Sequence, residues 1–210
     1  MKTSKQKMGS FWQEVHQLDQ EISLFINSFH TGFTDEIMKF FSHIQVWIPM
    51  YIIVVVFLFI RLGWKRALIV IASVALAFGM CDQFSNLIKD AVARLRPCKD
   101  DFMIQNGLWM LEGGGGMYGF FSAHAANSFS FAVSTLSGFR NDTRLRYRGY
   151  AAWIFFWALM VSISRIFVGK HYLGDVIVGI ITGILFGLFT AWLARYCIRK
   201  AGLGDHTNAV

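Results

Sequence analysis

Five stretches of the chain are apolar over lengths close to those needed to cross a bilayer as helices. They cover residues 46–60, 67–88, 120–137, 150–164 and 176–194. A bilayer core about 30 Å thick needs about 20 apolar helical residues, with some tolerance for tilt and thinning. The stretch 67–88 meets that length outright, whereas 46–60 is short and begins near Pro49. The pattern predicts an all-α, integral membrane helical bundle of about five transmembrane helices.

The first 45 residues follow a different pattern, in which polar residues interrupt the apolar ones. The apolar residues are spaced three or four apart, so a helix here has one apolar face and one polar, water-facing side. They are Leu18, Ile22, Phe25, Ile26 and Phe29. This is typical of an amphipathic helix lying on the membrane surface. We expect one domain, 1–210, with an interfacial segment at 1–45 and a transmembrane catalytic core at 46–198. If the first segment crossed instead, there would be six spans.

The last apolar stretch carries three glycines spaced by four, Gly179, Gly183 and Gly187. Small residues at this spacing let another helix approach closely. Packing within the chain is the favoured interpretation, and a homodimer formed through this stripe is the alternative.

Composition separates this chain from ordinary soluble domains. Apolar residues make up 55% and charged residues only 16%, against roughly a quarter charged in a typical soluble domain. Three cysteines and two prolines exclude a disulfide scaffold and a proline-rich linker protein. The net charge of +7 would suggest nucleic acid in a soluble protein, but in an apolar chain it reports membrane orientation, so no nucleic-acid partner is expected.

The charge is unevenly distributed between the two ends of the predicted bundle. The loops after the first and third stretches and the C-terminal segment hold ten basic residues against two acidic ones, Asp142 and Asp205. Because cytoplasmic loops are enriched in Lys and Arg, this end is expected to be cytoplasmic and the other to face outward. The N-terminal Lys2, Lys5 and Lys7 argue mildly against this orientation. We expect a bacterial inner membrane protein whose site faces the periplasm.

Polar residues gather at the outward ends of four stretches, where they are costly and are therefore functional candidates. They lie in the segments KDAVARLRP (89–97), FSAH (121–124) and SRIFVGKHYLGD (164–175). Lys89, Arg96 and Arg165 have no matching acids and suit a phosphate dianion. Ser122 and the backbone N–H groups from Ala123 onward lie where a helix begins, and a helix N-terminus favours the binding of an anion. No metal-ligand pattern is present, so neither a metal nor another cofactor is expected.

The two histidines of these segments suggest nucleophilic catalysis. His171 precedes Asp175 by four residues, so the carboxylate can fix one ring nitrogen and leave the other to attack phosphorus, giving a phosphohistidine. His124 would protonate the leaving oxygen and later activate water. Each residue also has a structural explanation when taken singly, as a membrane anchor or a helix cap.

Three further residues are secondary candidates. Asp82 lies on the helix face of Lys89 and either orients Lys89 or Arg165, or is buried against a neighbour. Asn127 lies one turn beyond His124 and either lines the pocket or bonds another helix. Ser164 begins the last polar segment. The connector 97–119 is long and contains four consecutive glycines, so it is interpreted as a lid or as a flexible link.

At these residues the sequence resembles the type 2 phosphatidic acid phosphatase superfamily, whose motifs are K-x6-RP, PSGH and SR-x5-H-x3-D. Residues 89–97 match the first motif, and Ser164, Arg165, His171 and Asp175 match the third. The second motif departs, because Phe121 and Ala123 replace proline and glycine. The Cβ of Ala123 and the lost proline put the shape of the loop in question. The resemblance runs from about residue 82 to 187, roughly half of the chain.

The resemblance implies a helical membrane core and metal-independent hydrolysis of a phosphate ester or anhydride. It implies His171 as nucleophile, Asp175 as its orienting group and His124 as acid. The phosphate would be held by four residues: Lys89, Arg96, Ser122 and Arg165. The same motifs occur in soluble vanadium haloperoxidases, so vanadate is expected to mimic the phosphate.

The expected partners are a lipid phosphate, which is the substrate, and the surrounding membrane lipids. Undecaprenyl diphosphate and a lipid A phosphate are favoured, and phosphatidylglycerol phosphate and phosphatidic acid remain alternatives. A lipid phosphotransferase using the same intermediate and a non-catalytic lipid binder or transporter are the rival functions. A haloperoxidase is disfavoured by the predicted spans.

Overall fold

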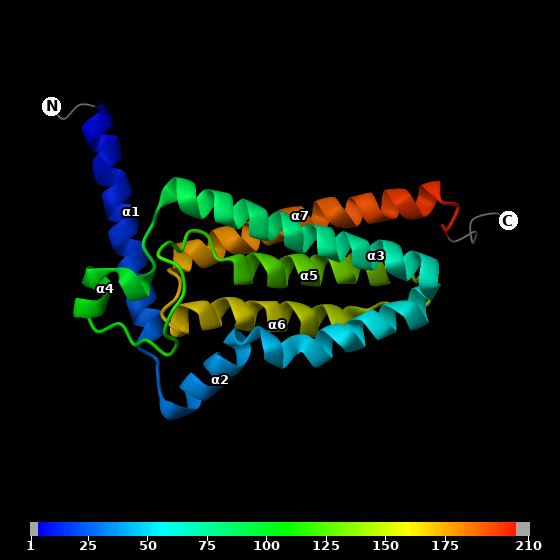
Figure 1. Ribbon diagram of the computed structural model, residues 1–210, viewed down its shortest axis with the longest axis horizontal. Coiled ribbons are helices and arrows are strands. Elements are labelled where there is room, and N and C mark those ends of the chain that lie inside the picture. Colours follow the sequence, from blue (N-terminus) through cyan, green and yellow to red (C-terminus); the bar gives the residue numbers. More distant parts are fainter. Residues whose placement is uncertain (1–3, 205–210) are drawn as a thin grey trace.

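The structure is a computed structural model, and it describes residues 4–204, with side chains from residue 10 onward. Lys2 and Asp205, which enter the charge count, lie outside these residues. The helices of the described chain are α1 (Ser4–Asn27), α2 (Gly32–Ser42), α3 (Ile48–Val92), α4 (Asp101–Gln105), α5 (Ala123–Phe139), α6 (Arg148–Phe167) and α7 (Leu173–Lys200), joined in part by 3-10 turns at Ile44–Trp47 and Pro97–Lys99. An isolated β-bridge joins Leu95 and Tyr118. The all-α class is confirmed (Figure 1).

The long helix α3 is broken at Gly63 into two limbs that run side by side in opposite directions (Figure 1). Gly63 has φ 73° and ψ 164°, a backbone conformation that residues with a Cβ rarely adopt. The predicted stretches 46–60 and 67–88 therefore correspond to the two limbs of one continuous element. Three segments are long and apolar enough to cross a membrane: Ile44–Val92, Arg148–Phe167 and Leu173–Lys200. The count of five spans remains a prediction.

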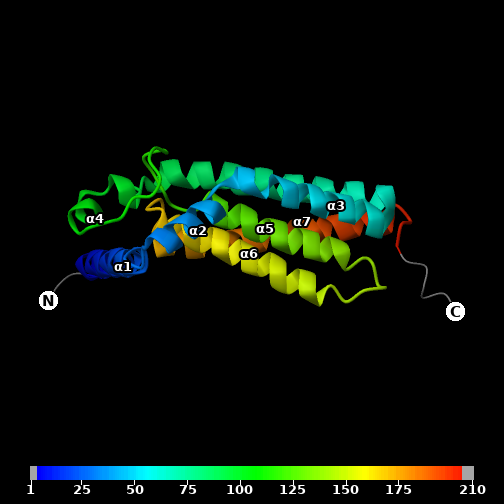
Figure 2. The ribbon, with the colours of Figure 1, turned by 90° about the horizontal axis from the view of Figure 1, so that it is seen from below.

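Helix α5 occupies the middle of the bundle, with α3, α6 and α7 around it (Figures 1 and 2). Small residues such as Ala125, Ala126 and Ser130 are buried on it, so neighbouring backbones approach closely. A Cβ placed on Gly179 or Gly183 would collide with the carbonyl oxygens of Ser122 and Ala126. The glycine stripe of α7 thus packs against α5 within the chain, and it is buried rather than exposed to a second chain.

Helix α1 lies across one end of the bundle, roughly perpendicular to the other long helices (Figures 1 and 2). Its apolar residues Leu18 and Phe25 are more than half exposed, as is Phe29 just after the helix, whereas Ser23 and Asn27 are buried. Part of the polar face therefore packs against the protein, whereas Glu14, Gln17 and Glu21 on the same helix stay exposed. Its exposed apolar face suits the membrane interface. The first 45 residues also form two helices, because the chain turns between α1 and α2.

The basic loops gather at the opposite end of the bundle from α1, as the charge pattern predicts (Figure 1). There Asp142 is buried and accepts hydrogen bonds from Arg61 (2.6 Å), Arg144 (2.7 Å) and Tyr147 (2.6 Å). Burial acts to raise the pKa of Asp142, but these donors outweigh it and hold the pKa well below its usual range. The cluster ties the break in α3 to the loop between α5 and α6.

Candidate active site

The three polar segments meet at the end of the bundle that α1 crosses. Lys89 stands in the last turn of α3, and the chain then leads to Arg96, whose backbone N–H donates to Met117 O (3.0 Å). Ser122 is the N-cap of α5, and its N–H donates to the carbonyl of Asp175 at 3.0 Å. Backbone hydrogen bonds therefore join the first segment to the connector and the second segment to the third.

A cationic cavity of about 320 Å³ lies at this end and is lined by His124 and three basic residues. Two of the cations, Arg96 and Arg165, were predicted from the sequence, and Lys170 is the third. Arg165 is buried, donates to the hydroxyl of Ser42, and lies 3.7 Å from Glu112. Arg96 donates from Nε to the carbonyl of Tyr118 at 3.1 Å. Guanidinium and ammonium donors converging on one cavity suit a phosphate group.

His171 and Asp175 are paired beside this cavity, although neither lines it. The Nδ1 atom of His171 lies 3.4 Å from Oδ2 of Asp175, longer than a good N–H···O hydrogen bond. Burial lowers the pKa of His171 to about 4, and the nearby carboxylate of Asp175 opposes this shift. The ring is therefore neutral near pH 7, so its Nε2 keeps the lone pair that a nucleophile requires.

Asp175 has a partner that motif spacing does not reveal. Arg94 donates from Nη1 to Asp175 Oδ1 (2.8 Å) and from Nη2 to Asp19 of α1 (2.7 Å). Its guanidinium also lies over the ring of Tyr172, 4.0 Å from the centroid. Because Arg94 occupies a variable position of the first motif, its role could not be predicted from the motif spacing.

Helix α1 caps the helix that carries Asp175. The backbone N–H of Gly174 donates to Asp19 (2.8 Å), and that of Leu173 donates to Ser23 (2.9 Å). These are N–H groups that the first turn of α7 cannot satisfy itself. The segment predicted to be only interfacial therefore supports the site directly, and Ser42 from α2 lines the cationic cavity.

The connector before α5 forms part of the wall of the cationic cavity. Lys170 donates to the carbonyls of Gly113 (2.8 Å) and Gly114, and Glu112 lines the cavity beside them. Asn27 of α1 accepts from the backbone N–H of Trp109 (2.7 Å) and donates to its carbonyl (3.0 Å). The connector is thus held at both ends of the segment 109–114. Neither Glu112 nor Lys170 belongs to a recognisable pattern, so the sequence missed both.

Several predicted residues lie apart from the cationic cavity. Lys89 and Ser122 do not line it. The hydroxyl of Ser122 accepts from the N–H of Ala125 (3.4 Å), which is a capping role. Ser164 donates to the carbonyl of Val161 (2.7 Å) within its own helix. Within residues 4–204, no three His, Cys, Asp or Glu side chains are grouped so that they would hold a metal ion.

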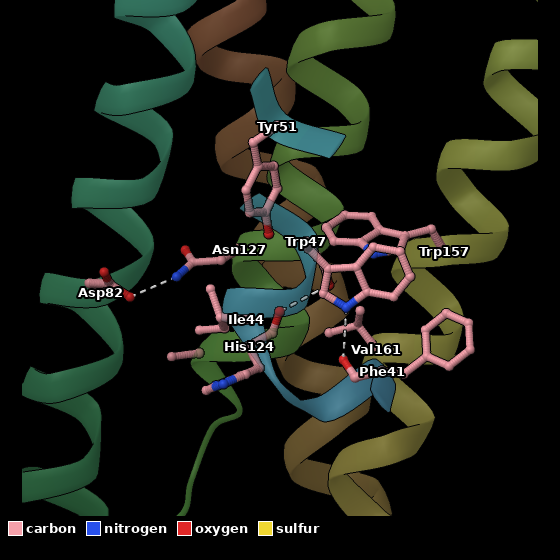
Figure 3. Close-up of a pocket in the computed structure, with 11 residues that line it drawn as sticks. Phe41, Ile44, Trp47, Tyr51, Asp82, His124, Asn127, Trp157 and Val161 are labelled. Carbon is pink, nitrogen blue, oxygen red and sulfur yellow. Dashed lines mark hydrogen bonds between the residues drawn. The ribbon is translucent and has the colours of Figure 1, made fainter. Parts of the chain in front are cut away.

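A second cavity, of about 190 Å³, is also lined by His124 (Figure 3). Trp47, Tyr51 and Trp157 line it together with Asp82 and Asn127. Asn127 donates from Nδ2 to Asp82 Oδ1 at 2.8 Å. Asn127 therefore lines this second cavity rather than the cationic one, and it also bonds another helix, α3. Asp82 is hydrogen-bonded to Asn127 rather than to Lys89 or Arg165 in this part of the structure.

Comparison with known proteins identifies the family of this chain. Residues 66–199 match the sequence profile of the PAP2 superfamily. A lipid A 4'-phosphatase of Bacteroides thetaiotaomicron is 34% identical over 188 residues, which is 89% of this chain and 79% of the relative. A lipid A 4'-phosphatase of Porphyromonas gingivalis is 30% identical over 201 residues, 93% of this chain and 82% of the relative.

Two crystal structures share the fold at 20% sequence identity. One is a transmembrane PAP2 type phosphatidylglycerolphosphate phosphatase from Bacillus subtilis, with a TM-score of 0.66 and 87% of each chain covered. The other is Aquifex aeolicus LpxE, with a TM-score of 0.59, covering 81% of this chain and 92% of that one. Together with the apolar helices, these likenesses confirm an integral membrane fold. The chain belongs to the PAP2 superfamily.

Proposed function

We propose that this chain removes the 4'-phosphate from lipid A by way of a phosphohistidine on His171. The broader statement holds independently of this proposal: the protein is an enzyme of the lipid phosphatase class, and it hydrolyses a lipid phosphate. The observation that carries the proposed reaction is the cavity lined by Arg96, Arg165, Lys170 and His124. Lipid A is favoured over the other lipid phosphates because both relatives described above are lipid A 4'-phosphatases.

The reaction divides into two displacements at phosphorus. In the first, Nε2 of His171 attacks phosphorus, the bond from phosphorus to the sugar oxygen breaks, and His124 gives its proton to that oxygen. In the second, His124 takes a proton from water, which attacks the phosphohistidine and releases inorganic phosphate. The cations of the cavity stabilise charge on the phosphoryl oxygens in both steps. Asp175 keeps the His171 ring in the tautomer whose Nε2 is free.

A panel of purified substrates tests the assignment of the substrate. The detergent-solubilised enzyme is given lipid A, undecaprenyl diphosphate, phosphatidylglycerol phosphate and phosphatidic acid in EDTA, and released phosphate is measured. We expect the highest kcat/KM for lipid A. A preference for another member of the panel would overturn the choice of lipid A, and recovery of the phosphate on a second lipid would contradict hydrolysis.

Trapping the intermediate tests the nucleophile. With ³²P-labelled lipid A, quenching in alkaline SDS should leave a label on the wild-type chain that is stable in base and lost in acid. The label should be absent from His171→Gln. His124→Gln should slow turnover by about 10²–10⁴-fold, the usual contribution of general acid–base catalysis. A leaving group that needs no proton, as in p-nitrophenyl phosphate, should reduce that loss. Labelling of His171→Gln at the wild-type level would overturn the mechanism.

We also propose that the site faces the periplasm of a bacterial inner membrane. The support is the collection of basic loops at the end opposite the site. Thr143 is exposed in one of these loops and is suited to labelling, whereas Asp142 is buried. In a chain with Cys98 and Cys197 replaced by serine, Thr143→Cys should react with an impermeant maleimide only after cells are permeabilised. Reaction in intact cells would reverse the orientation.

A further inference from the structure

The cavity of about 190 Å³ lined by aromatic residues (Figure 3) is distinct from the cationic cavity but shares His124 and Ile44 with it. His124 lines both, so each cavity adjoins the residue proposed to protonate the leaving oxygen. When the phosphate occupies the cationic side, the group on the far side of the scissile P–O bond is directed into this second cavity. Its lining therefore bears on which leaving group the enzyme accepts.

The polar groups of this cavity are not fully used by the protein. Trp157 is 2% exposed, and its indole Nε1–H has no hydrogen-bond partner among residues 4–204. The Oδ1 atom of Asn127 is also buried without a partner in the described chain, while its Nδ2 donates to Asp82. Unpaired buried donors and acceptors are unfavourable unless a ligand or water pairs with them. The cavity thus offers a donor, an acceptor and a carboxylate to a polar ligand.

The aromatic walls of the cavity are held in fixed positions. Trp47 and Trp157 pack edge to face with ring centroids 5.7 Å apart, and Tyr51 packs on Trp157 at 5.9 Å. Trp47 donates from Nε1 to the carbonyl of Phe41 at 3.3 Å (Figure 3). Flat apolar surfaces of this kind are complementary to the C–H face of a ring. A cavity of this size is below the roughly 300–1,000 Å³ of a site for a drug-sized ligand, and it suits a single ring.

We propose that this cavity is a subsite for the sugar ring that bears the phosphate, with Asp82, Asn127 and Trp157 binding ring substituents and Trp47 packing on the ring face. A sugar has both a C–H face and hydroxyl or amide groups. The glycerol of a phosphoglycerolipid has no ring, and a prenyl chain has no hydroxyl groups to pair with the polar atoms. The ligand class is therefore a phosphorylated glycolipid. This inference rests on the proposed function for the phosphate side, because His124 joins the two cavities.

Substrate selectivity in two variants tests the subsite. Trp157→Phe keeps an aromatic face and removes the N–H, and Asn127→Ala removes the unpaired carbonyl. For each variant, kcat/KM is measured with lipid A, phosphatidic acid and farnesyl diphosphate. The ratio of kcat/KM for lipid A to that for phosphatidic acid should fall about tenfold, as the loss of one buried hydrogen bond to the substrate predicts. Equal losses on all three substrates would overturn the sugar subsite.

Two neighbouring residues supply matched controls. Trp153→Phe is the control for Trp157→Phe, because it makes the same substitution one turn away on α6. Asn86→Ala is the control for Asn127→Ala and lies at an exposed position of α3. Neither residue lines the second cavity, so both ratios should equal that of the wild type. Thermal melting in detergent checks that all four variants fold.

Equilibrium binding separates failure of the subsite from failure of the proposed function. Radiolabelled, dephosphorylated lipid A in nanodiscs should bind the wild type and bind Asn127→Ala about tenfold more weakly. If no member of the panel is hydrolysed but this difference in binding is found, the proposed function fails and the subsite stands. If lipid A is hydrolysed and neither selectivity nor binding changes, the subsite fails alone.

Discussion

Arg94 and Asp175 form an ion pair at 2.8 Å that joins the end of α3 to the start of α7. The other carboxylate oxygen of Asp175 faces His171, and the other terminal nitrogen of Arg94 binds Asp19 of α1. One guanidinium therefore links the carboxylate beside His171, the proposed nucleophile, to the helix that crosses the end of the bundle. Position of the nucleophile and docking of α1 depend on the same side chain.

Arg94→Ala should reduce both stability and activity. Asp175 is completely buried, and removing one partner of a buried pair typically costs about 3–5 kcal/mol. Because the Arg94 side chain keeps 17% exposure, we expect the lower end of that range. The melting temperature in detergent and the rate of phosphate release should fall together. Arg94→Lys keeps the charge but not the two-sided donor geometry, so it should recover stability only in part. Wild-type behaviour of Arg94→Ala would contradict this role.

The pH profile should show an acid limb near pH 4. Burial lowers the pKa of His171 to about 4, and protonation of Nε2 removes the lone pair that attacks phosphorus. Activity should therefore be lost as pH falls through about 4. Asp175 acts to raise this pKa, so Asp175→Asn should move the acid limb to lower pH as well as reducing kcat. An acid limb near 6.5 in the wild type would show that the ring is not buried in the working enzyme.

Glu112→Gln should tighten inhibition by vanadate. The carboxylate of Glu112 accepts from Ser42 (2.5 Å) and lies 3.7 Å from Arg165, so it competes with a bound anion for the same cation. Removing its charge should lower the inhibition constant by roughly tenfold, which corresponds to about 1.4 kcal/mol. Glu14→Gln, on an exposed part of α1, is the matched control and should leave the constant unchanged. Weaker inhibition of Glu112→Gln would mean that Glu112 supports the anion site.

Gly183→Ala should destabilise the bundle, because its new Cβ would collide with the backbone of Ala126. Overpacking of this kind typically costs about 1–3 kcal/mol. Gly79→Ala is the matched control: Gly79 is also helical, but a Cβ there meets nothing within 4 Å. The melting temperature of Gly183→Ala should therefore be lower than that of Gly79→Ala. A stable, monomeric Gly183→Ala beside a dimeric wild type would instead assign the glycine to a contact between chains.

Much of the site could be predicted because its residues follow fixed spacings. Arg96, His124, Arg165, His171 and Asp175 were all found from polar side chains in an apolar chain, and the structure brings these positions to one end of the bundle. Arg94, Glu112 and Lys170 were missed because each is a charged residue near a span end, where a solvated side chain is the common outcome. Only contact with a partner distant in sequence gives them a role.

The partial burial of the polar face of α1 could not be predicted for a related reason. Hydrophobic periodicity locates a polar stripe, but it does not say whether that stripe meets water or protein. Ser23 and Asn27 belong to the polar stripe of α1, yet they are buried because they pair with backbone groups of Leu173 and Trp109. The unsatisfied N–H groups at the start of α7 and the unpaired backbone of the connector supply those partners.

The sequence by itself determined the class of the fold, the end of the bundle that carries the charge, and the residues proposed for the chemistry. It did so because membrane insertion demands apolar length and because phosphate chemistry demands cations and histidines at fixed separations. Tertiary structure decided which cations share a cavity, that Arg94 forms an ion pair with Asp175, and that His124 lines two cavities of different character. These outcomes depend on contacts between segments up to 155 residues apart, such as Asp19 with Gly174, and spacing along the chain carries no record of them.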